Sequence, residues 1–276
     1  MSPQPTPIPL SPGACDCHIH VFDPAYPLAP TARVRPPAAA RLQDYRKLQT
    51  TLGLTRAVVV QPTGYGFDNA CTLAALASLG TDARGVAVVD ASVSDASLVQ
   101  MHAAGIRGVR FMMLPGGVLP WDMLEPVAAR IAPLGWHVNL QVDGADFPRL
   151  LQRLARLALP LVIDHTGKFL TPVAPSDPAF LALRALLDSG SCWIKLSAPY
   201  ETSRTGAPAY ADVGVLASTL AQAYPQRCLW ASNWPHMGQA IAPDGAALLD
   251  LLRSWAGDDT HVRRILVDNP QDLYGF

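Results

Sequence analysis

The sequence predicts a single (β/α)8 barrel, the fold also called a TIM barrel. Eight short apolar or β-branched runs alternate with longer segments rich in Ala and Leu, and no long polar linker divides them. The chain has 276 residues, half of them apolar, which is enough for one large core. Strands that each precede a helix indicate a parallel sheet, and eight such units form a closed barrel. A doubly wound open sheet is the competing fold, and strand counting barely separates the two.

The predicted elements follow one another in a regular order. Strands are expected over residues 14–20, 56–61, 85–90, 108–112, 137–142, 161–164, 192–197 and 228–231. Helices are expected over residues 68–80, 95–104, 121–134, 146–157, 178–188 and 208–224. Several helices begin at an Asp or Ser that can cap the first turn, and several end at Gly. We therefore expect a barrel over residues 14–276, preceded by a proline-rich tail over residues 1–13.

Composition and charge exclude several classes of function. The net charge is −1, from 21 basic and 22 acidic residues, so no electrostatic footprint for nucleic acid or an anionic membrane is present. No apolar run approaches the roughly 20 residues that span a bilayer, and the N-terminus lacks the features of a signal peptide. Five scattered cysteines argue against a disulfide framework. We expect a cytoplasmic protein, whose oligomeric state the sequence does not set.

The first predicted strand carries the stretch CDCHIH. Because side chains alternate across a strand, Asp16, His18 and His20 are expected on one face, and Cys15 and Cys17 on the other. Thiols and imidazoles then cannot converge on one metal ion. We expect two histidines at the mouth of the barrel and two thiols on the packing side.

Polar residues also end three later strands, where a barrel carries its chemistry. Arg110 ends the fourth strand and is a candidate clamp for a substrate carboxylate, because a buried guanidinium needs an anion. His165 ends the sixth strand. Asn233 and His236 follow the eighth strand in the turn SNWPH. These side chains are expected to meet His18 and His20 at the mouth.

Two further cations have structural interpretations. Lys195 in the seventh strand is expected to enter the barrel and to form an ion pair with Asp16 or Asp164. Arg107 lies three residues before Arg110 and is expected at the surface or in a second layer.

Six ordered segments together resemble the amidohydrolase superfamily, in the branch around 2-pyrone-4,6-dicarboxylate lactonase. They are DCHIHVFDP, VVVQPTGYGFDN, GIRGVRF, LVIDHTGK, WIKLSAPYETSR and LWASNWPH, and they run from residue 15 to residue 236. The resemblance implies a metal-dependent-hydrolase-like barrel, a cytoplasmic enzyme, and a carboxylated lactone as its small-molecule partner. It also implies that His18, His20 and His165 gather around the lactone carbonyl, that Arg110 and Arg204 hold substrate carboxylates, and that His236 lies near the catalytic carboxylate.

The sequence departs from that branch at Asn233. The family lactonase has an aspartate there as general base, and an asparagine cannot accept a proton at neutral pH. We expect hydrolysis of the lactone ester, with His236 as the replacement base. In the alternative, a substrate hydroxyl attacks the carbonyl, and the product is an isomeric lactone. A galactarolactone isomerase in this branch resembles that arrangement.

No metal ion is expected, although many superfamily members bind one or two. Gln141 stands where a fifth-strand ligand is expected, His137 lies too deep, and the eighth-strand aspartate is missing. If zinc binds, its ligands are expected to be His18, His20 and His165. That alternative is a zinc-dependent amidohydrolase or decarboxylase. A binding protein without catalytic activity is the third class of function.

Substrate specificity is expected to differ from that of the pyrone lactonase. Gly116 replaces a further arginine of that enzyme, and Arg35 is a candidate replacement. Thr63, Gln141 and Asn233 give the site hydroxyl and amide groups. A sugar-acid lactone is therefore expected to fit better than a planar pyrone dicarboxylate.

Overall fold

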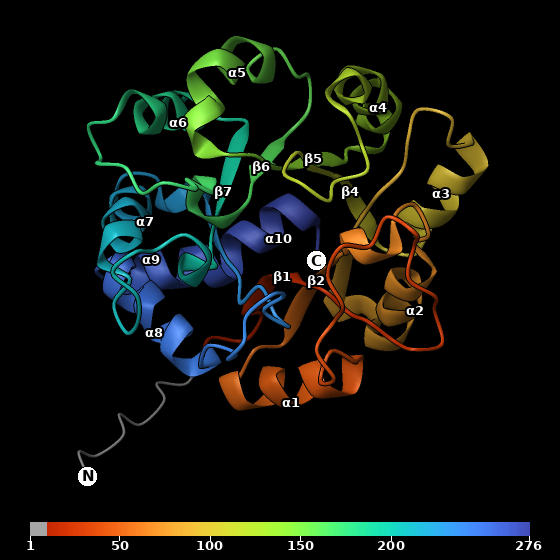
Figure 1. Ribbon diagram of the computed structural model, residues 1–276, viewed down its shortest axis with the longest axis horizontal. Coiled ribbons are helices and arrows are strands. Elements are labelled where there is room, and N and C mark those ends of the chain that lie inside the picture. Colours follow the sequence, from red (N-terminus) through yellow and green to blue (C-terminus); the bar gives the residue numbers. More distant parts are fainter. Residues whose placement is uncertain (1–9) are drawn as a thin grey trace.

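The computed structural model describes residues 10–276 and confirms the barrel (Figure 1). Eight parallel strands follow one another around the sheet in chain order. Between β8 and β1 the wall is closed by an isolated bridge, in which Ile19 pairs with Trp234 and the His20 N–H donates to the Trp234 carbonyl at 2.8 Å. The strands are β1 (Cys15–Ile19), β2 (Arg56–Val60), β3 (Ala83–Ala87), β4 (Ile106–Met112), β5 (His137–Gln141), β6 (Leu161–Ile163), β7 (Cys192–Leu196) and β8 (Cys228–Trp230).

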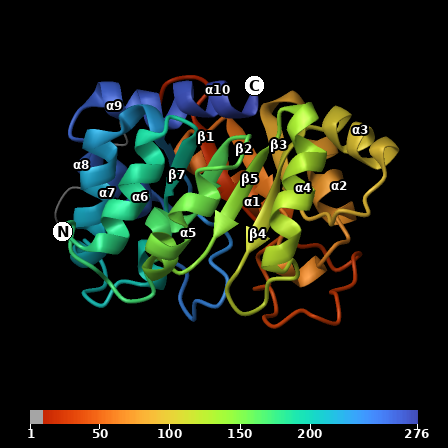
Figure 2. The same ribbon diagram turned by 90° about the horizontal axis from the view of Figure 1, so that it is seen from above.

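Helices cover the outside of the barrel, as Figures 1 and 2 show. They are α1 (Leu42–Leu52), α2 (Ala70–Leu79), α3 (Asp95–Ala103), α4 (Leu124–Ile131), α5 (Phe147–Leu154), α6 (Pro178–Asp188), α7 (Ala211–Ala223), α8 (Gly245–Ala256), α9 (Asp259–Arg263) and α10 (Asn269–Tyr274). The predicted ends of the strands and of the six predicted helices agree with these bounds within three residues. No range was predicted for helices α1, α8, α9 and α10. Residues 1–9 of the predicted tail lie outside the described part of the chain.

Two apolar clusters lie on the two faces of the sheet. The larger one fills the space between the strands and the outer helices. The smaller one lies inside the barrel and contains Cys15, Cys17, Val58, Val60, Val86, Val162, Trp193, Leu229, Ala231 and Tyr274. Tyr274 belongs to α10, which lies at the opposite end of the barrel from the loop between β1 and α1 (Figure 2). The polar side chains at the C-terminal strand ends are therefore at the open end.

The predicted assignment of faces in β1 was wrong for Asp16 and the thiols. Cys15 and Cys17 face the barrel interior, whereas the Asp16 carboxylate accepts from the backbone N–H and the hydroxyl of Ser232. The pairing register of β1 shifts between Asp16 and Ile19, and this irregularity breaks the strict alternation of side chains. His18 therefore faces the interior directly after Cys17.

The prediction that no disulfide framework is present agrees with the structure. All five cysteines are free and buried. Within residues 10–276, no helix has the length and apolar character needed to cross a membrane.

Candidate active site

A cavity of about 150 Å³ lies at the C-terminal end of the barrel. Its walls contain six of the ten predicted site residues, namely His20, Thr63, Arg110, Gln141, His165 and Asn233. The remaining lining residues are Phe22, Val34, Pro62, Gly64, Met112, Glu201 and Met237. His18 lies directly behind this lining, because its ring contacts those of His20 and His165.

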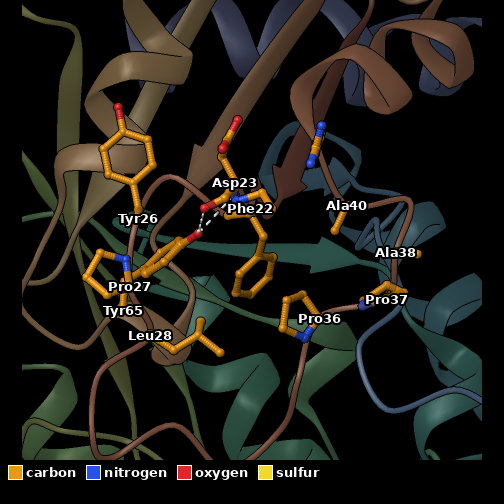
Figure 3. Close-up of a pocket in the computed structure, with 12 residues that line it drawn as sticks. Phe22, Asp23, Tyr26, Pro27, Leu28, Pro36, Pro37, Ala38, Ala40 and Tyr65 are labelled. Atoms are coloured by element: carbon orange, nitrogen blue, oxygen red, sulfur yellow. Dashed lines mark hydrogen bonds between the residues drawn. The ribbon is translucent and has the colours of Figure 1, made fainter.

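A larger groove of about 530 Å³ lies next to this cavity. Figure 3 shows aromatic and proline side chains around it, among them Phe22, Tyr26 and Pro36 from the loop after β1. The Tyr65 hydroxyl accepts from the Asp23 N–H at 2.9 Å and donates to the Asp23 carbonyl at 3.2 Å, which ties this loop to the loop after β2. Phe22 lines both spaces. The lining of the larger groove contains no histidine, whereas His20 and His165 face the smaller cavity, which is therefore the candidate active site.

The rings of His18 and His20 form one chain of hydrogen bonds. His20 Nδ1 lies 2.7 Å from the Val60 carbonyl oxygen, which only accepts, so Nδ1 carries the proton. The two Nε2 atoms are 3.2 Å apart, so His18 Nε2–H donates to His20 Nε2. Lys195 Nζ then donates to His18 Nδ1 at 3.1 Å. Burial lowers the pKa of His20 to about 3 and that of His18 well below its usual range, so both rings are neutral.

A buried ion pair between Lys195 and Asp164 contacts the ring of His18. Lys195 Nζ lies 3.2 Å from Asp164 Oδ1, and both side chains are fully buried. This contact confirms the ion pair predicted for Lys195. Asn139 donates to Asp164 Oδ2 at 2.7 Å and accepts from Lys195 at 2.5 Å. Burial alone would raise the pKa of Asp164, but the Lys195 ammonium beside it holds that pKa well below its usual range.

His165 presents a ring nitrogen to the cavity from the end of β6. Its Nδ1 lies 2.9 Å from the Ser197 hydroxyl, which leaves Nε2 available to a ligand. The His165 backbone has a positive φ of 54°, and Thr166 follows with 56°. Such values are unfavourable for residues with a β-carbon and cluster at functional sites. Burial lowers the pKa of His165 well below its usual range, so this ring is also neutral.

Arg110 is a buried cation without a bonded carboxylate among the described residues. It is 6 % exposed and donates to two neutral oxygens, Gln61 O at 3.1 Å and Gln141 Oε1 at 2.9 Å. Its Nε atom is buried without a partner in the same part of the chain. Burial lowers its pKa, because desolvation disfavours the charged form. An anion entering the cavity would supply the missing opposite charge.

Asn233 contacts polar groups from the loop after β7. Its Nδ2 donates to Glu201 Oε1 at 2.9 Å and to the Tyr200 hydroxyl at 3.0 Å. Glu201 also forms an ion pair with Lys168, whose side chain is 9 % exposed. Burial lowers the pKa of Lys168 to about 8.

Glu201, Tyr200 and Lys168 were not predicted as site residues. Glu201 and Tyr200 stand in the segment WIKLSAPYETSR, and Lys168 stands in LVIDHTGK. The rule that loops after barrel strands form the active site could have identified them.

Asn233 is held in place by the contact between β8 and β1. Its N–H donates to the His18 carbonyl at 3.1 Å, and the preceding Ser232 is held by Asp16. Burial raises the pKa of Asp16 to about 6. The φ of Asn233 is 59° and that of His236 is 62°, so this turn is strained in the same way as the turn at His165. The backbone of Asn233 is therefore fixed at β1, and its side chain lines the same cavity as His20.

Besides His18, three predicted residues do not line the cavity. His236 is buried behind Tyr200, and its Nδ1 lies 2.9 Å from the Tyr200 hydroxyl. Burial lowers the pKa of His236 to about 4. The side chains of Arg204 and Arg35 are exposed, on the loops after β7 and β1 respectively. The Arg204 N–H donates to Asp212 Oδ2 at 2.7 Å, which fixes its backbone.

One set of potential metal ligands comes together among residues 10–276. It consists of His18, Asp164 and His165, with one atom of each within 4.8 Å of the others, whereas the expected set had His20 in place of Asp164. The Lys195 ammonium contacts both His18 and Asp164, so a cation already occupies this cluster. A catalytic zinc ion takes three protein ligands. The residues present do not fit such a site while Lys195 stands among them.

Comparisons with known proteins place this site in a family. The model of the family described as Amidohydrolase matches residues 15–276. The chain belongs to the amidohydrolase family. It is 36% identical over 266 residues to a D-galactarolactone isomerase of Agrobacterium fabrum, which covers 95% of this chain and 91% of the relative. It is 38% identical over 278 residues to a 2-pyrone-4,6-dicarboxylate hydrolase of Comamonas testosteroni, which covers 96% and 91%.

Solved structures agree with this assignment. A crystal structure of an Agrobacterium tumefaciens protein without ligand superposes with a TM-score of 0.92 at 35% identity, and the match covers 97% of both chains. A probable 2-pyrone-4,6-dicarboxylic acid hydrolase of Acinetobacter baumannii with citric acid bound gives a TM-score of 0.85 at 27% identity, covering 96% of this chain and 100% of that chain. This amidohydrolase is therefore an enzyme with the barrel fold of its relatives.

Proposed function

We propose that this amidohydrolase hydrolyses the ring ester of a carboxylated lactone. The observation that carries the proposal is Arg110, a buried guanidinium bonded only to neutral oxygens within the described chain and facing the same cavity as His20 and His165. A substrate carboxylate at Arg110 places a neighbouring ester carbonyl near the histidines. The similarity to a 2-pyrone-4,6-dicarboxylate hydrolase supports this substrate class.

The neutral histidines then act on the ester carbonyl. With the Ser197 hydroxyl donating to Nδ1, His165 presents Nε2–H to the oxygen on which negative charge develops. His20 completes the wall around the carbonyl, His18 lies behind it, and the Lys195 charge next to His18 adds a favourable field. One such hydrogen-bond donor contributes about 10²–10³ in rate. Attack by water opens the ring and gives an acid and an alcohol.

Isomerisation of the lactone is the second candidate, and Asn233 favours it. An amide replaces the carboxylate expected at this position, and an amide cannot take a proton from water. A hydroxyl group of the substrate could then attack the carbonyl and form a lactone of different ring size. The similarity to a D-galactarolactone isomerase supports this alternative.

Three further points belong to the proposal. The reaction runs without a metal ion, because Lys195 supplies the cation in the cluster of His18, Asp164 and His165. The substrate is a sugar-acid lactone, whose hydroxyl groups suit Thr63, Gln141 and Asn233 better than a planar pyrone would. The enzyme works in the cytoplasm in the breakdown of carbohydrate acids, where free buried cysteines stay reduced.

Proton NMR of a panel of lactones tests the proposal. The purified protein is incubated without added metal with aldaro-1,4-lactones, aldaro-1,5-lactones and 2-pyrone-4,6-dicarboxylate. Ring opening to the free acid supports hydrolysis, whereas exchange between ring sizes without net acid supports isomerisation. The proposal fails if no lactone with a carboxylate reacts.

The variant Asn233→Asp separates the two reactions further. A carboxylate at this position can accept the proton of water, so the variant should gain hydrolysis relative to isomerisation. If the wild type is an isomerase and Asn233→Asp remains a pure isomerase, Asn233 does not determine the reaction.

A further inference from the structure

We infer that Glu201 is the proton acceptor for the hydroxyl group that attacks the lactone carbonyl. This inference rests on the proposed function and names the base that Asn233 cannot supply. Glu201 is a carboxylate in the wall of the cavity, and its Oε1 is bonded directly to Asn233 Nδ2 at 2.9 Å. The carboxylate therefore stands one hydrogen bond away from the position where a base was expected.

Glu201 and Asn233 stand on different loops, which follow β7 and β8 respectively. It lies in the turn Pro199–Glu201 after β7, where Ala198 has a positive φ of 50°. The neighbouring Tyr200 hydroxyl accepts from the same Asn233 amide at 3.0 Å. Because both amide hydrogens of Asn233 are engaged, the orientation of its side chain is fixed. Asn233 thereby holds the Glu201 carboxylate in place, and Glu201 takes the proton of the attacking hydroxyl group.

The ion pair with Lys168 suits Glu201 to this task. A bare carboxylate at the mouth would repel the carboxylate of the substrate, and the Lys168 ammonium cancels that repulsion. The Lys168 ammonium and the Asn233 amide both bond to the Glu201 carboxylate and hold it in the wall of the cavity. Its side chain is 16 % exposed, so water can reach it.

The step balances in both reactions. The O–H bond of the attacking group breaks, its proton passes to a Glu201 oxygen, and a C–O bond forms at the carbonyl carbon. When the tetrahedral intermediate collapses, the ring C–O bond breaks and Glu201 returns the proton to the leaving oxygen. With water as the attacking group the product is the hydroxy acid, and with a substrate hydroxyl it is the isomeric lactone.

His236 is the competing base, and its surroundings are less suitable. Its Nδ1 is engaged by the Tyr200 hydroxyl, it does not line the cavity, and burial lowers its pKa to about 4. A ring with that pKa is a weaker base than an unperturbed imidazole at neutral pH.

The experiment compares Glu201→Gln with Glu125→Gln, the same change at the other glutamate of the sequence. Glu125 lies on the outer surface of α4 and pairs with Arg153 at 2.6 Å, far from the cavity lining. Loss of a positioned base predicts a fall in kcat of about 10²–10⁴ for Glu201→Gln with KM changed less than about threefold. Glu125→Gln should keep the wild-type kcat. The wild-type pH profile should lose activity on its acidic side, and Glu201→Gln should lack that dependence.

Two further variants keep the test decisive. Glu201→Gln leaves the Lys168 ammonium unpaired, so the double variant Glu201→Gln/Lys168→Met removes both charges and should be equally slow. Added formate should restore part of the activity of Glu201→Ala, which a purely structural role would not allow. The inference is overturned if the wild type turns over a lactone and a folded Glu201→Gln keeps more than a third of kcat. If the wild type turns over no carboxylated lactone, the proposed function itself fails.

Discussion

The substitution Lys195→Met tests the buried support of the histidines. Lys195 is fully buried and contacts Asp164 Oδ1 at 3.2 Å, His18 Nδ1 at 3.1 Å and Asn139 Oδ1 at 2.5 Å. Methionine keeps most of the volume but removes the charge. The Asp164 carboxylate then stays buried without its cation, because His18 is neutral.

The magnitude follows from the burial of both partners. Removal of one partner of a buried ion pair destabilises a protein by about 3–5 kcal/mol, because the remaining charge is desolvated and unpaired. At about 2–4 °C per kcal/mol for a chain of this size, the melting temperature should fall by roughly 6–20 °C. The double variant Lys195→Met/Asp164→Asn removes both charges together and should recover most of this loss.

Thermal unfolding followed by circular dichroism at pH 7 measures these differences. Lys47→Met is the matched control, because Lys47 pairs with Asp44 at 3.1 Å but is 77% exposed. An exposed pair contributes at most about 1 kcal/mol, so the control should shift the melting temperature only slightly. The reasoning would be refuted if Lys195→Met cost less than the control, or if the double variant were no more stable than the single variant.

Three further predictions concern the cavity and the effect of pH. Arg110→Gln should lower kcat/KM for a carboxylated lactone by roughly 30-fold to several thousand-fold, the equivalent of about 2–5 kcal/mol. Arg107→Gln is the control and should change kcat/KM little, because the Arg107 guanidinium bonds only to backbone carbonyls outside the cavity. The free energy of unfolding should fall as the pH drops from about 6.5 towards 3, because burial lowers the folded-state pKa of His20 and His137 to about 3 and that of His236 to about 4. In this range only the unfolded chain binds those protons, so acid favours unfolding. A melting temperature that rises on acidification would contradict this. Activity should survive dialysis against a chelator, with less than one metal ion per chain by elemental analysis, and a loss that zinc restores would show that a metal ion is required.

Periodicity and the barrel rule were sufficient to predict the scaffold. Each strand is an apolar run whose alternate residues face the interior or the helices, and polar residues at the strand ends marked the mouth. Arg110, His165 and Asn233 could be placed in the site for this reason. The ion pair of Lys195 followed from the same alternation.

Local backbone irregularities were not predictable in this way. The face assignment of Asp16 and the thiols failed because alternation assumes a regular strand, and the register of β1 shifts at that point. Glu201 was not predicted because it lies in a turn after β7 and not in the strand itself. The alternation of side chains along a strand therefore says nothing about where its carboxylate points. Its contact with Asn233 joins residues that are 32 positions apart in the chain and depends on how two loops fold over the mouth.

The charges around the cavity connect these observations. Arg110, Lys168 and Lys195 are the cations that line the cavity or support its walls, and Asp164 and Glu201 are the carboxylates that accompany two of them. Each carboxylate has its own lysine, which leaves the positive charge of Arg110 for a ligand. One substrate carboxylate therefore completes the balance in the interior, where an unpaired charge is most costly. A second carboxylate would have to lie at the rim, where Arg35 and Arg204 are exposed and where solvent screens its charge. In the proposed function, the buried guanidinium orients the substrate by one end, and Asn233 and Glu201 face the ring ester at the other end.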